Sequence, residues 1–414
     1  MVTEIKRCRI CGEAKLTEVF SLGELALSGL FPRTIESDPP SGPLTLVSCA
    51  GECGFVQLKH DYDREQFFQD SYGYCSGRNP AMVAHLRKSA LEALAMARIN
   101  SGAVVIDIGS NDGTLLWALA GKGLELYGVD PIAGRFAGRY PQGTALSSEF
   151  FPGPDLRRKL QGKKARIITS FALIYSTPDP LAMAREVRSL LGPEGIWVFE
   201  QSYLPLMLRS AAYDSICHEH VGYFSLRTLC WLLRNAGMKV VKLQLNDVNG
   251  GSIQITAAPL ESHWAQAPEL EEEIRREEEI LSQRNSFSDF RRRVEKGRDE
   301  LRALLERYRR EGKRVSGVGA STKGNILLQY CELGPELISQ IAEVSPEKYG
   351  HVTPGSHIPI VSEERDRDCS PDVRLILPWH FRSHFLEAER DFISRGGIVV
   401  FPLPVLEVIG EESR

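Results

Sequence analysis

The fold of this chain is decided by the stretch Val104-Val105-Ile106-Asp107-Ile108-Gly109-Ser110-Asn111-Asp112-Gly113-Thr114. An apolar strand runs into a turn of small and acidic residues, and a helix is expected after the turn. Gly109 lets the backbone approach a ligand closely, while Asp107 and Asp112 place acceptors at the carboxyl end of the strand. The stretch therefore predicts a turn that binds a nucleoside cofactor in an α/β domain.

A second strand, Leu124–Val129, ends in Asp130. Its spacing in the sequence from the glycine turn is close to that of the carboxylate that binds a ribose diol in nucleotide-binding βαβ units. A dinucleotide fingerprint would carry glycines for a pyrophosphate, whereas this turn reads G-S-N-D-G, and its acidic groups repel phosphates. They suit S-adenosylmethionine (SAM), which has positive sulfonium and amino groups, a ribose diol and no phosphate. The alternative, an ordinary strand and turn of an α/β domain, gives no reason for two acidic signals in register.

Length and composition limit the function classes. A chain of 414 residues with 43% hydrophobic residues should hold two to four domains with real cores. Fifty Lys plus Arg against 54 Asp plus Glu give a formal charge of −4, so no global basic field indicates nucleic acid or an anionic membrane. No apolar run approaches 18 residues and the start lacks a signal-peptide core. We expect a cytoplasmic protein without nucleic-acid or membrane partners, and leave monomer or dimer open.

Four of the nine cysteines form two pairs, Cys8 with Cys11 and Cys49 with Cys53, and a glycine follows each pair. Two such knuckles are typical of a tetrahedral four-cysteine zinc site, with free thiols as the alternative. An ion held by four thiolates has no open position, so the predicted zinc is structural and stabilises residues 1 to about 65.

Further strands are predicted at 165–170 and 195–200, with helices between them, which extends a parallel sheet. Ligands lie off the carboxyl ends of such strands, so residues 200–202 should lie around the same cleft. The predicted cofactor-binding residues are Asp107, Gly109, Ser110, Asn111, Asp112, Asp130, Ser170 and Phe171.

Tyr72 and Tyr74 precede an amphipathic helix expected at about 80–98, which leads into the glycine turn. That position favours tyrosines near the mouth of the cofactor site. Packing beneath a domain junction is the alternative, and the sequence leaves both open.

A second chemical cluster is His218-Glu219-His220. Histidine titrates near neutrality and a neighbouring carboxylate can fix its tautomer, so the cluster could remove a proton from carbon next to a carbonyl. Structural hydrogen-bonding histidines and a metal site are the alternatives. Residues i and i+2 share a face only on a strand, and the H-E-x-x-H spacing of zinc hydrolases is absent.

The last part of the chain predicts a hairpin turn at Gly250-Gly251, charged helices over 268–313 interrupted near residues 285–286, and another α/β unit. We interpret the helical stretch as a solvated bridge. In the turn of the last unit, Ser321 and Lys323 replace the acids, which suits an anion at a helix N-terminus. The predicted domains are 1–68, 69–262, 263–312 as a helical linker, and 313–414.

The chain resembles the sugar C-methyltransferases that act on nucleotide-linked 4-keto deoxysugars in antibiotic and surface-polysaccharide pathways. The resemblance covers nearly the whole chain, and the order and spacing of its motifs are specific. They are Cys8-x2-Cys11 with Cys49-x3-Cys53, Tyr72-x-Tyr74-x-Ser76, the 107–113 turn, His218-Glu219-His220-x-x-Tyr223-Phe224, Gly250-Gly251-Ser252 and 319–325.

This resemblance implies a zinc-binding N-terminal domain, a central Rossmann-like SAM domain, and a C-terminal Rossmann-like domain that holds the nucleotide-sugar. It implies that His220 deprotonates the carbon next to the ketone, at C3, which is then methylated. Glu219 would orient His220, and Tyr74 or Tyr72 would donate to the enolate oxygen, with His218 as the next candidate base. The substrate-binding residues expected on this basis are Tyr72, Cys217, Tyr223, Ser321, Lys323 and Asn325.

Two departures from the family pattern leave the sugar open. Cys217 and Ser176 stand at positions that face the sugar, where tyrosine and histidine are frequent in the family. Two other function classes are also kept. One is a SAM-dependent O- or N-methyltransferase, and the other is a non-catalytic zinc-ribbon adaptor with a degenerate methyltransferase fold.

Overall fold

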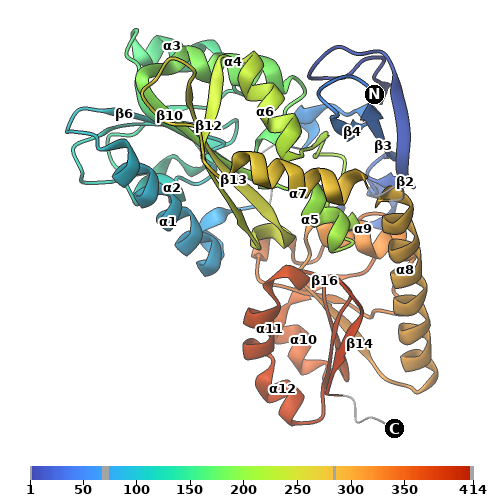
Figure 1. Ribbon diagram of the computed structural model, residues 1–414. Coiled ribbons are helices and arrows are strands. Elements are labelled where there is room, and N and C mark those ends of the chain that lie inside the picture. Colours follow the sequence, from blue (N-terminus) through green and yellow to red (C-terminus); the bar gives the residue numbers. More distant parts are fainter. Residues whose placement is uncertain (1, 68–73, 283–285, 411–414) are drawn as a thin grey trace.

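The structure is a computed structural model that describes residues 2–67, 74–282 and 286–410. Three lobes are visible in Figure 1, each built around its own sheet: an N-terminal module in blue, a central domain in teal to yellow, and a C-terminal domain in orange to red. The predicted α/β class with a small N-terminal module and two larger sheet domains is confirmed.

The N-terminal module contains a four-stranded antiparallel sheet in the order β11-β4-β3-β2. Its strands are β2 (Leu16–Ala26), β3 (Ser41–Cys49), β4 (Val56–Leu58) and β11 (Gly222–Tyr223). β11 comes from the central domain, immediately after the histidine cluster, and pairs with β4 through Gly222 and Gln57. A separate ribbon joins β1 (Thr3–Glu4) to β5 (His60–Asp61). The module is therefore fixed directly to the segment that carries His220.

The central domain has a seven-stranded sheet in the order β12-β13-β10-β9-β6-β7-β8, in which β13 is antiparallel to both neighbours and the other described pairings are parallel. The strands are β6 (Val104–Ile108), β7 (Glu125–Val129), β8 (Ala145–Ser147), β9 (Ala165–Phe171), β10 (Leu191–Ser202), β12 (Met238–Asn246) and β13 (Ser252–Pro259). The predicted strands are confirmed, as is the hairpin turn at Gly250-Gly251 between β12 and β13. Their apolar side chains are buried on both faces, as expected for a covered parallel sheet.

Helices cover both faces of this sheet. The helices are α1 (Pro80–Ala97), α2 (Thr114–Trp117), α3 (Pro154–Leu160), α4 (Pro180–Leu190), α5 (Leu204–Arg209) and α6 (Leu226–Asn235). The Asn79 side chain accepts from the first turn of α1, and Pro80 opens that helix. Leu86 of α1 belongs to the cluster on one face, and Leu229 of α6 to the cluster on the other.

Two charged helices, α7 (Leu270–Ser282) and α8 (Ser286–Arg310), connect the central and C-terminal domains. Figure 1 shows α8 along one flank, between the N-terminal module and the C-terminal domain. The predicted helices are confirmed, and α8 begins at Ser286, while residue 285 lies outside the described residues. None of the helices in the described ranges is both long and apolar enough to cross a membrane.

The prediction that this helical stretch is merely a solvated bridge is wrong. Phe290 of α8 is fully buried and its ring lies 4.9 Å from the ring of Phe20 in β2. In α7, the buried Glu277 carboxylate accepts from the Tyr203 hydroxyl and from the first amides of α6. The sequence shows apolar positions at helical spacing within this charged stretch, and in the structure those of α8 pack into the core instead of facing solvent.

The C-terminal sheet has the order β16-β15-β14-β17-β18-β19, with five parallel strands and an antiparallel β19. Its strands are β14 (Val315–Val318), β15 (Ile341–Glu343), β16 (Ile360–Ser362), β17 (Val373–Ile376), β18 (Ile398–Phe401) and β19 (Glu407–Ile409). Its helices are α9 (Thr322–Tyr330), α10 (Glu363–Asp368), α11 (Arg382–Ala388) and α12 (Arg390–Ser394). The expected second Rossmann-like unit is present.

Candidate active site

A cavity of about 610 Å³ lies where the three lobes meet. Gly29 and Phe31 of the N-terminal module form part of its wall. The central domain contributes the ends of β6, β7, β9 and β10, and the C-terminal domain contributes the turn after β14 and the end of β15. A cavity bounded by two parallel sheets at their carboxyl edges is the expected place for a cofactor and a substrate to meet.

Two of the three carboxylates predicted for the cofactor, Asp107 and Asp130, line this cavity. Asp107 is the penultimate residue of β6, where its Oδ1 accepts a 2.6 Å hydrogen bond from the Thr169 hydroxyl. Asp130 follows β7 and accepts from the Asn111 amide at 2.9 Å. Burial raises the pKa of Asp107 to about 7, with the charge of Asp130 acting in the same direction. A cation bound beside Asp107 would lower its pKa again, because a nearby positive charge favours the charged carboxylate.

Other predicted cofactor residues divide into two groups. Gly109, Ser110, Asn111 and Phe171 line the cavity. The Asp112 carboxylate instead accepts from the Cys75 thiol, the Gly77 amide and the Thr114 hydroxyl, and Ser170 Oγ accepts from the Trp197 ring N–H at 3.0 Å. Both side chains are therefore occupied in holding the turn and the sheet.

The residues present fit SAM chemically. Asp107 and Asp130 would offer negative charge to its amino group and acceptors to its ribose. Gln201, at the carboxyl end of β10, lines the cavity and is 1% exposed, yet neither atom of its side-chain amide has a hydrogen-bond partner. A buried amide without partners is costly unless a ligand satisfies it.

His220 faces the cavity with its tautomer fixed. Its Nδ1 lies 3.0 Å from the Ser215 carbonyl oxygen, and a carbonyl can only accept, so Nδ1 carries the proton. The ring packs on Tyr175, with centroids 4.1 Å apart. Burial and, to a smaller extent, the charge of Lys323 lower the pKa of His220 to about 3. The imidazole is neutral, and its Nε2 lone pair is left as the basic atom.

The other two members of the cluster do not act on His220. His218 is buried against the N-terminal module, where its Nε2 lies 3.2 Å from the Gly42 carbonyl oxygen and its ring contacts Tyr62. Burial lowers the pKa of His218 to about 4. His218 thus matches the structural alternative, and the four-cysteine group is the only cluster of potential metal ligands found among the described residues.

Glu219 lines the cavity, but its expected role of orienting His220 is corrected by the geometry, because the Ser215 carbonyl holds Nδ1. A Cβ at position 29 would clash with Glu219 Oε1, so the carboxylate fits only because a glycine of the N-terminal module faces it. Burial raises the pKa of Glu219 to about 7, while a hydrogen bond from Thr322 opposes the shift. Glu219 of the central domain therefore lies between Gly29 of the N-terminal module and Thr322 of the C-terminal domain.

Of the tyrosines, Tyr74 lines the cavity and is 47% exposed, while Tyr72 lies outside the described residues. The expectation that Cys217 and Tyr223 face the substrate is not met by this cavity. Cys217 is fully buried in the core, and Tyr223 packs behind His220 with its hydroxyl 3.5 Å from the Ser215 carbonyl oxygen. Cys217 lies just before β11 and Tyr223 lies in it, and both side chains are buried there.

The C-terminal domain contributes a polar wall. Ser321 lines the cavity and caps α9 by accepting from the Gly324 amide, and Lys323 donates to the Asn249 carbonyl at 2.7 Å. Asn325 is fully buried outside the cavity wall, and its amide donates to Ser28 of the N-terminal module. Asn325 joins two lobes, whereas Ser321 and Lys323 are available to an anion.

Sequence reasoning missed the residue that fixes the tautomer of His220. Ser215 acts through its backbone carbonyl, so its side-chain type carries no signal. Gln201 fell within a stretch expected near the cleft, but only its burial without partners makes it a candidate for contact with a ligand.

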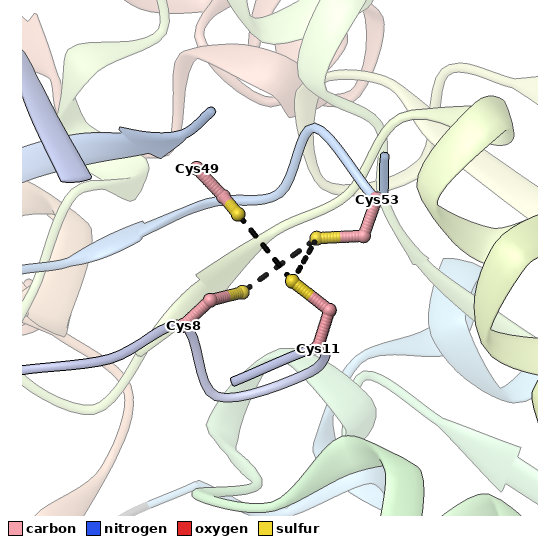
Figure 2. A group of neighbouring side chains, drawn as sticks. All are labelled: Cys8, Cys11, Cys49 and Cys53. Atoms are coloured by element: carbon pink, nitrogen blue, oxygen red, sulfur yellow. Dashed lines mark hydrogen bonds between the residues drawn. The ribbon is translucent and has the colours of Figure 1, made fainter. Parts of the chain in front are cut away.

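The four cysteines of the N-terminal module point their sulfurs toward one another (Figure 2). The Sγ atoms of Cys8 and Cys53 are 3.6 Å apart, those of Cys11 and Cys49 are 3.5 Å apart, and those of Cys11 and Cys53 are 3.3 Å apart. Zn–S bonds of about 2.3 Å in a tetrahedron require sulfurs about 3.8 Å apart, close to this arrangement. The donor set fits a structural zinc ion with no open coordination position.

Comparisons with known proteins agree with this division of the chain. A zinc-binding domain model matches residues 8–68, a methyltransferase domain model matches 82–243, and a C-methyltransferase C-terminal domain model matches 247–404. The C-methyltransferase NovU of Streptomyces niveus is 31% identical to this chain in an alignment of 427 positions. The alignment covers 100% of this chain and 99% of NovU. The chain belongs to the C-methyltransferases. It is a SAM-dependent enzyme with a structural zinc site, so the adaptor alternative is set aside.

Solved structures with a partial similarity to the chain include two methyltransferases. Magnesium protoporphyrin IX methyltransferase (ChlM) of Synechocystis PCC 6803 with bound SAH is 15% identical, with a TM-score of 0.34, and covers 43% of this chain and 84% of its own. The 1,6-didemethyltoxoflavin-N1-methyltransferase of Burkholderia thailandensis is 18% identical, with a TM-score of 0.33, and covers 44% and 82%.

Proposed function

We propose that this C-methyltransferase acts on a nucleotide-linked 4-keto deoxysugar and methylates the ring carbon next to the ketone, at C3. The observation that carries the proposal is the fixed neutral tautomer of His220, whose Nε2 faces the cavity shared with Asp107, Asp130 and Lys323. A carbon acid needs a positioned base, and a methylated carbon matches the family.

In this mechanism His220 Nε2 removes the proton from the carbon next to the ketone. The Ser215 carbonyl holds Nδ1–H throughout and stabilises the imidazolium that forms. The low pKa of His220 keeps the base unprotonated before the transfer, and the negative charge that develops on the substrate raises its basicity during the transfer. Bound SAM supplies the electrophilic methyl group.

The ketone oxygen becomes negative as the proton leaves, so a donor or cation beside it lowers the barrier. We assign this role to Tyr74, which lines the cavity, with Tyr72 as the next residue to test. Lys323 adds positive charge close to His220, because its charge lowers the pKa of the imidazole.

We further propose that the phosphates of the substrate lie against Ser321 and Lys323, at the N-terminus of α9. Amides at the start of a helix and a lysine side chain together favour an anion. The corresponding domain boundaries are 1–68, 69–262, 263–312 and 313–414.

The proposal is tested by incubating the protein with SAM and a panel of dTDP-, GDP- and CDP-linked 4-keto sugars, with mass detection of a product gaining one methylene. NMR then distinguishes the classes, because a C-methyl singlet on a quaternary carbon differs from a methoxy or N-methyl signal. A methoxy or N-methyl product would replace this proposal by O- or N-methylation. No product with any sugar, from protein that binds SAM, would refute the substrate class.

A further inference from the structure

The central and C-terminal domains repeat one structural unit. In the central domain the Gly109 amide donates to the Val129 carbonyl at 2.8 Å, and in the C-terminal domain the Gly319 amide donates to the Ala342 carbonyl at the same distance. Both glycines have positive φ, +74° and +88°. This equivalence aligns the two turns residue by residue.

The residue after each accepting carbonyl is acidic. Asp130 follows Val129 at the end of β7, and Glu343 follows Ala342 at the end of β15. Asp130 accepts from the amide two residues later, Ile132, at 3.0 Å, and Glu343 accepts from the amide of Ser345, also two residues later, at 2.9 Å. The two carboxylates are therefore held in the same way, each by the turn that follows its strand.

Glu343 lines the large cavity and is 7% exposed. Its Oε1 accepts the amides of Val344 and Ser345, whereas Oε2 lies 3.4 Å from Lys348 Nζ as its nearest partner. That long contact leaves Oε2 able to accept from a ligand. The mechanism proposed above does not use this carboxylate.

The turns differ at the positions that select the ligand. With Gly109 aligned to Gly319, the acids Asp107 and Asp112 correspond to Gly317 and Thr322. The C-terminal domain thus keeps the carboxylate at the end of its second strand, Glu343. It has no carboxylates at the positions of Asp107 and Asp112 that could bind a cationic amine. Lys323 follows directly, which favours a phosphate-bearing ligand over a second SAM.

We propose that Glu343 accepts hydrogen bonds from the pentose hydroxyls of a nucleoside diphosphate, the part of the substrate remote from the reacting sugar. The inference rests on the proposed nucleotide-linked substrate and deepens it, because it names the residue that recognises the nucleoside. Lys323 and Ser321 meet the phosphates, and Glu343 Oε2 meets the hydroxyls.

The test is calorimetric binding of UDP, TDP, GDP and CDP to the full chain, followed by an analogue of the tightest ligand that lacks the pentose hydroxyls. Glu343→Gln keeps an oxygen for the turn amides but removes the charge, so it should fold normally. It should weaken binding of the hydroxylated nucleotide about tenfold or more and leave binding of the analogue and of SAM unchanged. Asp130→Asn is the reciprocal control and should weaken SAM binding alone.

Each contrary result has a separate meaning. If a nucleoside diphosphate binds equally to the wild type and Glu343→Gln, this inference is overturned while the proposed substrate class stands. If none of the nucleotides binds the wild type while SAM does, both fail together. If the wild type binds two SAM molecules and Glu343→Gln binds one, the carboxylate serves a second adenosyl group and the inference is wrong.

Discussion

His220 and Ser215 form the relationship on which the proposed chemistry depends: the imidazole Nδ1 lies 3.0 Å from the backbone carbonyl oxygen five residues earlier. The carbonyl fixes the tautomer without adding a titratable group. A backbone acceptor is also insensitive to side-chain substitution, so the orientation of the base depends on the path of the 213–220 loop. That path is stabilised by pairing of β11 with β4 of the zinc-binding module.

His220→Asn should lower turnover about 10²–10⁴-fold, since it removes the base while preserving approximate size. The dissociation constant of SAM, measured by calorimetry, should stay near the wild-type value. His263→Asn, at an exposed surface position, is the matched control and should keep full turnover. More than about a tenth of wild-type turnover in His220→Asn would show that another residue is the base.

SAM binding should weaken as the pH falls below 7. The pKa of Asp107 is raised to about 7 in the free protein, so the carboxyl is charged above this pH and neutral below it. A cationic ligand prefers the charged form, and the dissociation constant should therefore rise by up to about tenfold per pH unit below 7. Calorimetry at pH 6 and pH 8 measures the change.

Asp107→Asn should bind SAM weakly at both pH values. Because the pKa of Glu219 is also raised to about 7, Glu219→Gln is the control, and it should retain the pH dependence. Loss of the pH dependence in Glu219→Gln instead would assign the titration to Glu219.

Purified protein should contain about one equivalent of zinc, and Cys8→Ser/Cys11→Ser should lose both the metal and the fold of the N-terminal module. Activity should fall as well, because His218 and β11 pack directly against that module. Metal analysis and thermal unfolding check this, with Cys369→Ser, outside the cluster, as control. Wild-type protein with less than about half an equivalent of zinc, or a double variant of normal thermal stability, would contradict the assignment.

Phe290→Ala should lower the free energy of unfolding by about 3–5 kcal/mol, because it empties a fully buried site against Phe20. Arg292→Ala, on the exposed face of the same helix, should change it by less than about 0.5 kcal/mol. Denaturant titration separates the two. Equal, small effects would indicate that α8 is the solvated bridge expected from its composition.

Local pattern was sufficient for the elements and for the cofactor turn. The strand, glycine turn and acidic residues from Asp107 to Asp130 are close in sequence, so spacing alone places them at one sheet edge. In the same way, the short spacing within each cysteine pair is enough to predict that its two sulfurs lie close together. The partnership of His220 with Ser215 could not be predicted, because any residue supplies the same carbonyl. The misjudged solvent exposure of α8 has a related cause, since burial depends on which surface the apolar stripe meets.

The sequence by itself determined three lobes, a four-cysteine cluster and two glycine turns of opposite charge, because each leaves a local motif in the chain: a strand and glycine turn, or a pair of closely spaced cysteines. Only the tertiary structure decided which side chains share the cavity. It separated His220 from His218, turned Cys217 and Asn325 into the core, and brought Glu343 to the same cavity as Asp107. These outcomes depend on how the lobes pack together, and packing between distant segments leaves no periodicity in the sequence.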